Sequence, residues 1–378
     1  MPYSVAVVGV RGYGRQHLST LAHLAEDGIM EVTAAVDTQD PAEAEGVPGS
    51  AATFTSLDEM YEVMVPDVVV LATPIHTHGS LAEQAMRAGS HVLVEKPTTA
   101  TLAQFESLLA TAHETGRACQ VGFQSLGSAA LPEMARRITT GQIGEVRGIG
   151  AVGTWARGTD YYARAAWAGR RRMDGREVVD GVVTNPLAHS VATALKIAGA
   201  ARVEHVAEVV TDLFHAHDIE ADDTSAVRVS TTSGLTLSFG LTLAAAGHPP
   251  PRVIVYGTTG ELDLRYTEDI LSVRTGDTTE ELNLGRTCLL RNLHHHLTDG
   301  EPLLADVRDT GAFMRVLEAV RTAPDPAPIA PEHITWLDDA QFGHHPVVTD
   351  VEYWCEQVAI QGRTFSELAA PFTQPTTT

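Results

Sequence analysis

The 378-residue sequence has few cysteines and few basic residues. Its three cysteines, Cys119, Cys288 and Cys355, are far apart and odd in number, so they predict neither a disulfide framework nor a C-x-x-C metal motif. Lys and Arg number 26 against 48 Asp and Glu, which gives a formal net charge of −22. A chain this acidic repels phosphate backbones and anionic lipids, so neither nucleic-acid nor membrane partners are expected.

Long apolar runs are absent as well. None approaches the roughly 18 residues that suggest a membrane span, and no charged-then-apolar leader opens the sequence. Because the cysteine usage also suits a reducing compartment, we expect a soluble cytoplasmic protein. The length and the 44% apolar content predict two domains with ordinary cores.

Two different strand patterns divide the chain near residue 124. In residues 1–124, nearly continuous apolar strands such as SVAVVG and PDVVVLAT alternate with amphipathic helices. This alternation predicts an α/β domain with a doubly wound parallel sheet of the Rossmann type. In residues 125–378, longer strands such as PRVIVYGTTGELDLRY alternate apolar with polar side chains. They predict an α+β domain with a large, mainly antiparallel sheet flanked by helices.

The second domain is expected to contain helices near 186–199, 303–321 and 349–361. The Pro-rich segment 322–331 predicts a linker or wrapping arm, and residues 322–378 are expected to pack on this domain as an extension. The run from Arg170 to Arg172 is expected to be a solvated face.

A glycine-rich loop directly follows the first predicted strand. GVRGYG matches the first and third glycines of G-x-G-x-x-G at Gly9 and Gly14, but the middle position holds Arg11, with Gly12 one residue later. Gly9 suits a tight turn and Gly14 close packing of helix on strand. Backbone amides at the helix start, including that of Tyr13, would cradle a pyrophosphate.

Arg11 and Asp37 bear on the cofactor. A side chain at position 11 would hinder the pyrophosphate, but Arg is also a bidentate phosphate ligand, so we interpret the loop as reshaped rather than inactive. Asp37 ends the second predicted strand, where a carboxylate accepts hydrogen bonds from ribose hydroxyls. The following TQDPAEAE has no Lys or Arg to pair a 2′-phosphate, which favours NAD over NADP.

Two further segments, ATPIHTHGSL and HVLVEKPTT, follow strands at the carboxyl edge of the sheet, where open α/β sheets bind ligands. Lys96 would direct a cation into the cleft and orient a substrate hydroxyl; alternatively it is a surface lysine in a turn. His78 is a candidate contact or scaffolding at a helix start. The candidate cofactor contacts here and after the last strand are Thr73, Pro74, His78, Glu95, Lys96, Pro97 and Gln124.

In this order, GVRGYGRQHL, ATPIHTHGSLAEQAMRAGSHVLVEKPTTATLAQ and VGFQ resemble the Gfo/Idh/MocA family of glucose–fructose oxidoreductases and inositol dehydrogenases. The resemblance is strong over residues 4–124 and weaker through GQIGEV and YGTTGELDL. It implies NAD(P)-dependent oxidation of a sugar, cyclitol or related polyol hydroxyl. It also implies a large open sheet in the second domain that commonly makes dimers or tetramers. The expected partners are a small carbohydrate-like substrate and further copies of the chain, as a homodimer or homotetramer.

The resemblance also implies an Asp followed four residues later by His at a helix start. The matching segment DGVVTNPLAHSVATALKIAG has His189 but holds Asn185 at the Asp position. Residues i and i+4 share a helix face, so His189 is the expected general base. The resemblance implies a relay that would here be Lys96–Asn185–His189. Because an amide cannot share a proton, either His189 works with Lys96 alone or the chemistry differs from simple alcohol oxidation. Alternatively, His189 is a packing histidine, and Asn185, followed by Pro186, caps the helix.

An aromatic and basic segment, WARGTDYYARAAWAGRRRMDG, precedes that helix. Aromatic faces and guanidinium groups suit sugar rings or sugar acids, and the alternative is a packing segment with a basic surface. The candidate substrate contacts are Trp155, Arg157, Tyr161, Tyr162, Arg164, Trp167 and His189. No metal is expected, although His215 and His217 alternate as on a strand and Asp218 follows them, so that they could hold a metal with a third ligand.

Together these features predict an NAD-dependent oxidoreductase that transfers a hydride between nicotinamide and a secondary hydroxyl or ketone. One alternative is a lyase or glycosidase that recycles bound NAD through oxidation and elimination. The Asn at position 185, where the family has Asp, is the reason to consider it. The other is a non-catalytic NAD-dependent sensor, against which Lys96 and His189 argue.

Overall fold

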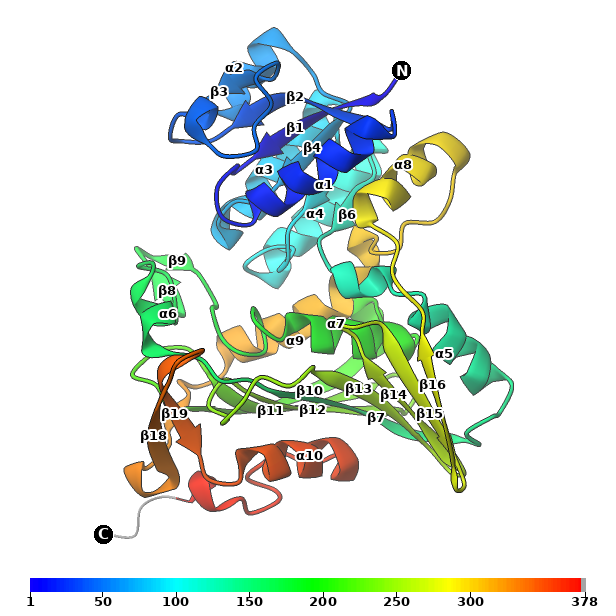
Figure 1. Cartoon of the computed structure of the whole chain (residues 1–378), viewed down its shortest axis with the longest axis vertical. Helices are drawn as coiled ribbons and strands as arrows, with labels where there is room; N and C mark the ends of the chain where they lie inside the picture. The colour runs from blue at the N-terminus through cyan, green and yellow to red at the C-terminus, as the bar shows by residue number, and fades with distance from the viewer. Residues whose placement is uncertain (375–378) are drawn as a thin grey trace. The chain divides into compact units, whose positions relative to one another are not determined.

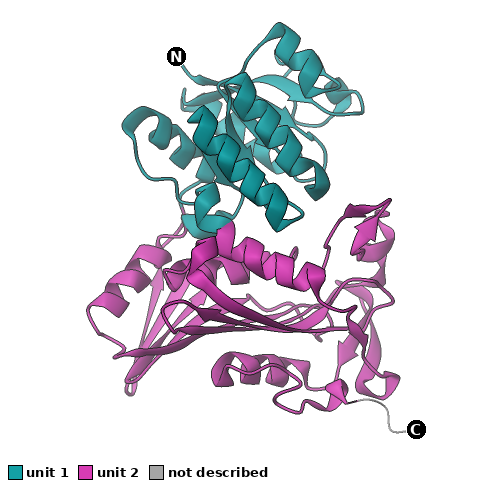
Figure 2. Cartoon of the chain, turned by 180° about the vertical axis from the view of Figure 1, so that it is seen from behind, with its two compact units in different colours: residues 1–127, 287–310 teal, residues 128–286, 311–378 magenta. Residues whose placement is uncertain are grey.

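The computed structural model describes residues 1–374 and divides into two compact units (Figure 2). Unit 1 comprises Met1–Gly127 and Thr287–Thr310, and unit 2 comprises Ser128–Arg286 and Gly311–Thr378. The division differs from the predicted one by three residues at the first boundary, 127 instead of 124, and by one whole segment. Thr287–Thr310 returns to unit 1, whereas the prediction assigned all of 125–378 to the second domain.

Unit 1 is the predicted doubly wound parallel sheet (Figure 1). Its strand order is β3-β2-β1-β4-β5-β6 and all neighbours are parallel. The strands are β1 (Tyr3–Val8), β2 (Met30–Val36), β3 (Ala52–Phe54), β4 (Val68–Leu71), β5 (His91–Val94) and β6 (Cys119–Val121). The connecting helices are α1 (Gly14–Glu26), α2 (Leu57–Val63), α3 (Ile75–Ala88) and α4 (Leu102–Thr115). The strand order reverses between β1 and β4, which is where such sheets bind ligands.

The returning segment completes unit 1 beside β6. It contains α8 (Leu289–Asp299), a helix that was not predicted. The fully buried Gln120 of β6 donates from Nε2 to the Leu289 carbonyl at 2.5 Å and accepts from the Ala305 amide at 3.3 Å. The Val121 amide donates to the Ala305 carbonyl at 2.9 Å. Because a buried amide side chain needs such partners, Gln120 ties the segment to the sheet.

Unit 2 is built on a nine-stranded, mostly antiparallel sheet, as predicted, in the order β16-β15-β14-β13-β7-β12-β11-β10-β17. Its strands are β7 (Val146–Thr154), β10 (Val206–His215), β11 (Thr224–Thr231), β12 (Thr236–Thr242), β13 (Arg252–Gly257), β14 (Gly260–Arg265), β15 (Ile270–Thr275), β16 (Thr278–Asn283) and β17 (Ala327–Pro328). The pairs β7–β12 and β10–β17 are parallel. A separate short hairpin joins β8 (Arg172–Met173) to β9 (Arg176–Glu177).

Helices cover both faces of this sheet. Figure 1 shows α7 (Ala188–Ile197) and α9 (Gly311–Thr322) on one face and α10 (Val351–Gln361) on the other. The remaining helices of unit 2 are α5 (Ala130–Thr139) and α6 (Thr159–Ala163). Among residues 1–374, no helix combines the length and apolar character needed to cross a membrane.

The contact between α10 and the sheet depends on two glycines. An ideal Cβ at Gly240 of β12 would lie 2.4 Å from the Cys355 carbonyl oxygen, and one at Gly150 of β7 would lie 2.7 Å from the Ala359 Cβ. Real Cβ atoms do not approach this closely, so α10 can lie directly on the strands only where side chains are missing.

The rest of the extension, as far as residue 374, also packs on unit 2. The Pro-rich arm contributes β17 at the sheet edge, where a proline removes no ladder hydrogen bond. A hairpin of β18 (Ile334–Asp339) and β19 (Gly343–Val348) follows. Phe365 and Phe372 then join Phe214 in a buried cluster with ring centroids 5.1 to 6.5 Å apart.

In the basic run that was expected to be solvated, Arg170 and Arg172 are 52% and 65% exposed, and Arg171 is the exception. Its Nη2 donates to the carbonyls of Val320, Arg321 and Ala323 at 2.9 to 3.1 Å. Only 16% of its side chain is exposed. The guanidinium therefore caps the C-terminal end of α9, where carbonyl groups lack helical partners and a cation is favourable.

Candidate active site

The glycine loop between β1 and α1 has the geometry of a phosphate cradle. Gly9 adopts φ +81°, and an ideal Cβ there would lie 2.6 Å from the Ala72 carbonyl oxygen. An ideal Cβ at Gly14 would lie 1.9 Å from the Gly9 carbonyl oxygen. Gly12 lies in open space, but its φ of +57° favours glycine. The loop thus brings backbone at the start of α1 close to β1 and β4, which fits the pyrophosphate of a dinucleotide.

Arg11, the predicted phosphate ligand of the reshaped loop, finds its partners just after β2. Its guanidinium lies at the end of β2, with Nη1 3.3 Å from Asp37 Oδ1. Nη1 also donates to the Gln39 carbonyl at 3.3 Å and Nη2 to the Asp40 carbonyl at 3.0 Å. The segment TQDPAEAE after Asp37 contains no Lys or Arg. The cation beside Asp37 is Arg11, which comes from the loop between β1 and α1.

Asp37 occupies the predicted place after β2. Its side chain is 12% exposed, and Oδ1 accepts a hydrogen bond from the Gln39 amide at 3.1 Å. The carboxylate that would bind ribose hydroxyls is therefore held from two sides, by a backbone amide and by Arg11.

Buried Glu95 connects three parts of unit 1. Its Oε1 lies 2.9 Å from His17 Nε2 and accepts from Gln124 Nε2 at 3.1 Å, while Oε2 accepts from the Lys96 amide at 3.1 Å. An ideal Cβ at Gly122 would lie 2.5 Å from Oε1, so that position must stay small. Glu95 thus fixes the backbone at Lys96.

His17 was missed by the sequence analysis. It lies on the buried side of α1, three residues after Gly14, and is 6% exposed. Tyr13 packs edge-on against its ring at 5.4 Å. The only available signal was a histidine at a helix position expected to face the sheet, and that alone does not indicate its partner.

His78 is scaffolding, the alternative that its helix-start position left open. It is 2% exposed, with Nδ1 2.8 Å from the Pro97 carbonyl oxygen and Nε2 2.8 Å from the Thr73 carbonyl oxygen. Burial lowers its pKa. His78 therefore links the ends of β4 and β5. The Thr73 hydroxyl bonds to the Thr77 hydroxyl at 2.7 Å. Pro74 immediately precedes α3. The peptide bond between Lys96 and Pro97 is cis.

Asn185 does not cap α7, contrary to one of the two predicted interpretations. The helix begins at Ala188, three residues later. Asn185 Nδ2 instead donates to Asp180 Oδ1 at 2.5 Å, and Asp180 Oδ2 accepts from the Gly169 amide at 2.8 Å. Asp180 is 6% exposed. Position 185 has no carboxylate of its own, but the carboxylate of Asp180 lies beside it. The sequence analysis missed this role of Asp180, although Asp180 is the first residue of the segment that contains Asn185.

His189 lies in the first turn of α7 and is partly exposed. Its ring centroid is 6.4 Å from that of Tyr266, at an interplanar angle of 30°. The Tyr266 hydroxyl bonds to Ser190 at 3.0 Å, and burial raises the pKa of this tyrosine. His189 is therefore backed by a fixed, uncharged aromatic ring.

The aromatic segment separates into two groups. Arg157 and Arg164 place their guanidinium carbons 4.1 and 3.7 Å from the Tyr161 ring centroid, and Arg164 is also 5.1 Å from that of Trp167. Trp155 belongs elsewhere: it stacks on His248 at 4.2 Å and donates from Nε1 to the Pro249 carbonyl. Four of the predicted substrate residues therefore form one cation–π cluster.

His217 is bound within the fold. Its Nδ1 is 2.7 Å from Asp223 Oδ2 and its Nε2 is 2.8 Å from the Arg157 carbonyl oxygen. Although burial opposes it, the hydrogen bonds from His217 hold the pKa of Asp223 below its ordinary value. Over residues 1–374, no three His, Cys, Asp or Glu side chains come together in a way that could hold a metal ion.

Family models match both units. The model described as "Oxidoreductase family, NAD-binding Rossmann fold" matches residues 3–123, and that for the GFO/IDH/MocA C-terminal domain matches residues 132–263. The chain belongs to the Gfo/Idh/MocA oxidoreductase family. The glycine cradle, Glu95 and Lys96 lie within the first match, and Asp180, Asn185 and His189 within the second. The extension from residue 322 onward lies beyond both.

Similar proteins in this family include dehydrogenases and reductases. The chain is 36% identical over 91 residues to the scyllo-inositol 2-dehydrogenase (NAD(+)) of Bacillus subtilis (strain 168); the match covers 23% of this chain and 27% of that one. The WlbA dehydrogenase from Bordetella pertussis, solved with NADH and UDP-GlcNAcA, has a TM-score of 0.70 at 22% identity, over 85% of this chain and 95% of that one. KijD10, a 3-ketoreductase from Actinomadura kijaniata solved with NADP and TDP-benzene, has a TM-score of 0.71 at 22% identity, over 87% and 100%. At these identities the solved structures establish the shared fold, and family membership alone leaves the choice between NAD and NADP open.

Proposed function

We propose that this chain is an NAD-dependent oxidoreductase acting on a secondary hydroxyl, or the corresponding ketone, of a sugar, cyclitol or sugar derivative. The observation that carries the proposal is the pair of supports behind the predicted reactive residues. Buried Glu95 fixes the backbone at Lys96 in the unit that contains the glycine cradle. Asp180 fixes Asn185 in the turn before His189. Such supports are typical of side chains that must hold a reacting group in one orientation.

Bound NAD supplies the nicotinamide that accepts or returns a hydride. The Lys96 ammonium stabilises negative charge on the substrate oxygen as its proton leaves. His189 takes that proton during oxidation and returns it during reduction.

Asn185 orients the substrate in this scheme. A carboxylate only accepts hydrogen bonds, so the bond to Asp180 turns the amide nitrogen of Asn185 toward it and presents the amide oxygen on the other side. That oxygen can accept from a substrate hydroxyl. Since an amide does not ionise, Asn185 positions the substrate without relaying a proton.

We further propose that NAD binds more tightly than NADP and that Arg11 narrows the difference. Asp37 suits ribose hydroxyls and its charge repels a 2′-phosphate. Arg11, 3.3 Å away, partly compensates that charge. The preference for NAD over NADP should therefore be weaker than it would be if no cation lay beside Asp37.

One assay separates this function from its alternatives. The purified chain is mixed with NAD and a panel of sugars, cyclitols, sugar acids and glycosides while NADH absorbance and substrate cleavage are followed. Net NADH formation supports the dehydrogenase. Cleavage without net NADH supports an enzyme that recycles its cofactor, and NAD binding without any turnover supports a sensor.

Self-association through the sheet of unit 2, as a homodimer or homotetramer, stays a prediction, as does a cytoplasmic location. Because α10 lies on β7 and β12, an interface on that face would have to use strands outside this cover, such as β14 to β16. Light scattering of the purified chain measures the oligomeric state directly.

A further inference from the structure

Two arginines of unit 2, Arg157 and Arg164, differ from their neighbours in how their charge is compensated. Neither forms an ion pair with any of the residues 1–374 that the structure describes. Arg170 of the same segment, in contrast, pairs with Glu220. In a chain with a net charge of −22, uncompensated guanidinium groups are where a negatively charged ligand is attracted.

Aromatic rings hold both guanidinium groups in place. Their central carbons lie 4.1 Å (Arg157) and 3.7 Å (Arg164) from the Tyr161 ring centroid, and that of Arg164 is also 5.1 Å from the Trp167 ring. A guanidinium stacks through its flat face, whereas its N–H donors point outward in its plane. Arg164 is exposed, so its donors can reach a ligand. Nε of Arg157 is buried, which leaves the two Nη atoms of that arginine as donors.

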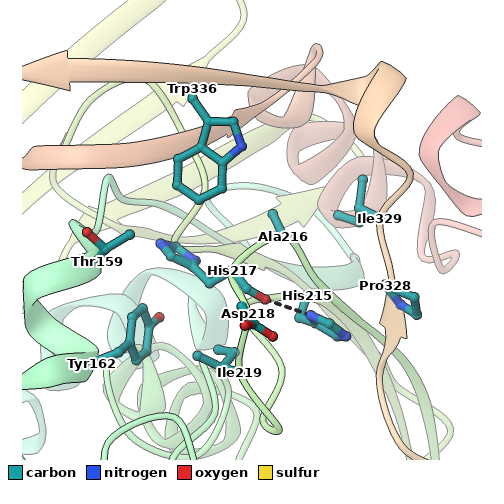
Figure 3. Close-up of a pocket in the computed structure, with 10 residues that line it drawn as sticks. All are labelled: Thr159, Tyr162, His215, Ala216, His217, Asp218, Ile219, Pro328, Ile329 and Trp336. Atoms are coloured by element: carbon teal, nitrogen blue, oxygen red, sulfur yellow. Dashed lines mark hydrogen bonds between the residues drawn. The ribbon is translucent and has the colours of Figure 1, made fainter.

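The helix that carries Tyr161, α6, is anchored by the next residue. Tyr161 packs edge-on against Tyr162 at 5.2 Å, and the Tyr162 ring lies 4.8 Å from that of His217 (Figure 3). His217 is fixed in turn by Asp223 and by the Arg157 carbonyl. Tyr161 therefore presents the two guanidinium groups from a fixed support, which reduces the entropy that a ligand must overcome on binding.

Tyr161 also connects the arginines to the residues before His189. Burial raises the pKa of Tyr161 and the charge of Asp180 raises it further, whereas the two guanidinium groups oppose the shift. Asp180 thus lies within electrostatic range of the Tyr161 hydroxyl, and it accepts the hydrogen bond from Asn185 Nδ2 at 2.5 Å. Tyr161, Asn185 and His189 are all partly exposed. A ligand held at the guanidinium groups is therefore only the Tyr161 side chain and one hydrogen-bonded pair away from the proposed reacting residues.

We propose that Arg164, assisted by Arg157, binds a carboxylate of the substrate, so that the substrate class is acidic sugars such as uronic acids. The inference rests on the proposed function, since the carboxylate would belong to the molecule whose hydroxyl reacts at His189. Around Tyr161 two guanidinium groups outnumber the single carboxylate of Asp180, so an anion is attracted. A carboxylate carries one charge, whereas a phosphate monoester carries nearly two and would be repelled more strongly by Asp180.

The test compares a sugar acid with its neutral counterpart. Because every residue of the site lies in unit 2, the full chain is tested without cofactor. It is titrated into 4-fluorophenyl β-D-glucuronide and, separately, 4-fluorophenyl β-D-glucoside, and binding is followed by fluorine NMR. The wild type should bind the glucuronide about tenfold more tightly, the effect of one charge-assisted pair of hydrogen bonds. Equal affinities, or no binding of either probe, overturn the proposal.

Variants locate the preference. Arg164→Gln should remove most of it and leave glucoside binding unchanged, while Arg164→Lys should keep part of it, because an ammonium retains the charge but not the fork of donors. Arg170→Gln is the matched control: it removes the same charge from the same segment, but from an arginine already paired with Glu220, and should change nothing. Equal losses in Arg164→Gln and Arg170→Gln would reveal a general charge effect and overturn the site.

Competition against the bound glucuronide probe distinguishes the two kinds of anion. D-Glucuronate should displace the probe at lower concentration than glucose 6-phosphate does, for the reason of charge given above. The reverse order would assign the site to a phosphate and overturn the carboxylate.

This inference and the proposed function fail separately. A chain that prefers the glucuronide through Arg164 but never turns over NAD keeps the anion site and loses the redox function. Turnover of neutral sugars by a chain without that preference does the reverse.

Discussion

The two units hold their predicted site residues in different ways. In unit 1 the cradle is made of backbone, held by the absence of side chains at Gly9 and Gly14 and by His78, which bonds to two carbonyls. In unit 2 it is made of side chains held by other side chains, as Asp180 holds Asn185. A backbone site demands particular residue types at particular spacings, so a motif reveals it. A side-chain site depends on pairs that spacing does not specify.

The largest expected effect is on the backbone site. Gly14→Ala would place a Cβ 1.9 Å from the Gly9 carbonyl oxygen, so the loop must move and NAD affinity should fall about a hundredfold or more. Isothermal titration calorimetry measures the affinity. Gly12→Ala is the matched control, since it only strains φ in open space, at a cost of about 1–2 kcal/mol. Equal losses in the two variants would show that close packing is not what the cradle requires.

The next effect falls on unit 2 alone. His189→Ala removes the proposed base and should lower kcat by about 10²–10⁴, while NAD affinity, which depends on unit 1, stays the same. Steady-state kinetics on the substrate found by the panel measures kcat, and NAD titration provides the second readout. His23→Ala, an exposed histidine bonded to its own helix, serves as control. Unchanged turnover in His189→Ala would remove His189 from its role.

A pH-dependent effect tests the side-chain pair. Asn185→Asp would place a second carboxyl group against Asp180, and two carboxylates this close raise the pKa of one of them. A raised pKa in the folded state stabilises the fold at low pH and loses that contribution as the pH rises through it. The free energy of unfolding of the variant, relative to wild type, should therefore be lower at pH 8 than at pH 5, by about 1–3 kcal/mol.

Chemical denaturation at several pH values measures that difference. A stability difference from wild type that does not vary with pH would mean that Asp180 and residue 185 do not share a proton. A large gain in dehydrogenation at neutral pH would mean that the native asparagine reduces this step and that the second carboxylate is tolerated.

The smallest expected effect is at Arg11. Arg11→Gly removes a partly exposed ion pair, so NAD affinity should change less than about fivefold, with a larger loss for NADP. Arg15→Ala removes the neighbouring, more exposed pair with Glu45 and should change neither affinity. NAD binding that appears only in Arg11→Gly would mean that the native loop is inactive.

The extent of sequence-based prediction follows the same division. The glycine loop, Asp37, Glu95-Lys96-Pro97 and the two domain folds were predictable, because each depends on local conformation or on a repeating apolar pattern. The partners of these residues were not. Nothing along the chain indicates that His17 meets Glu95 or that α8 returns to unit 1.

By itself, the sequence determined where a dinucleotide cradle forms, since only glycine tolerates the backbone contacts and positive φ angles of that loop. Tertiary structure alone decided that Arg11 faces Asp37, that Asp180 supports Asn185, and that Gln120 holds the segment with α8 against β6. The physical reason is the separation along the chain of the residues that interact. Backbone conformation is decided within a few residues, whereas hydrogen bonds and packing between side chains depend on which segments the completed fold brings together.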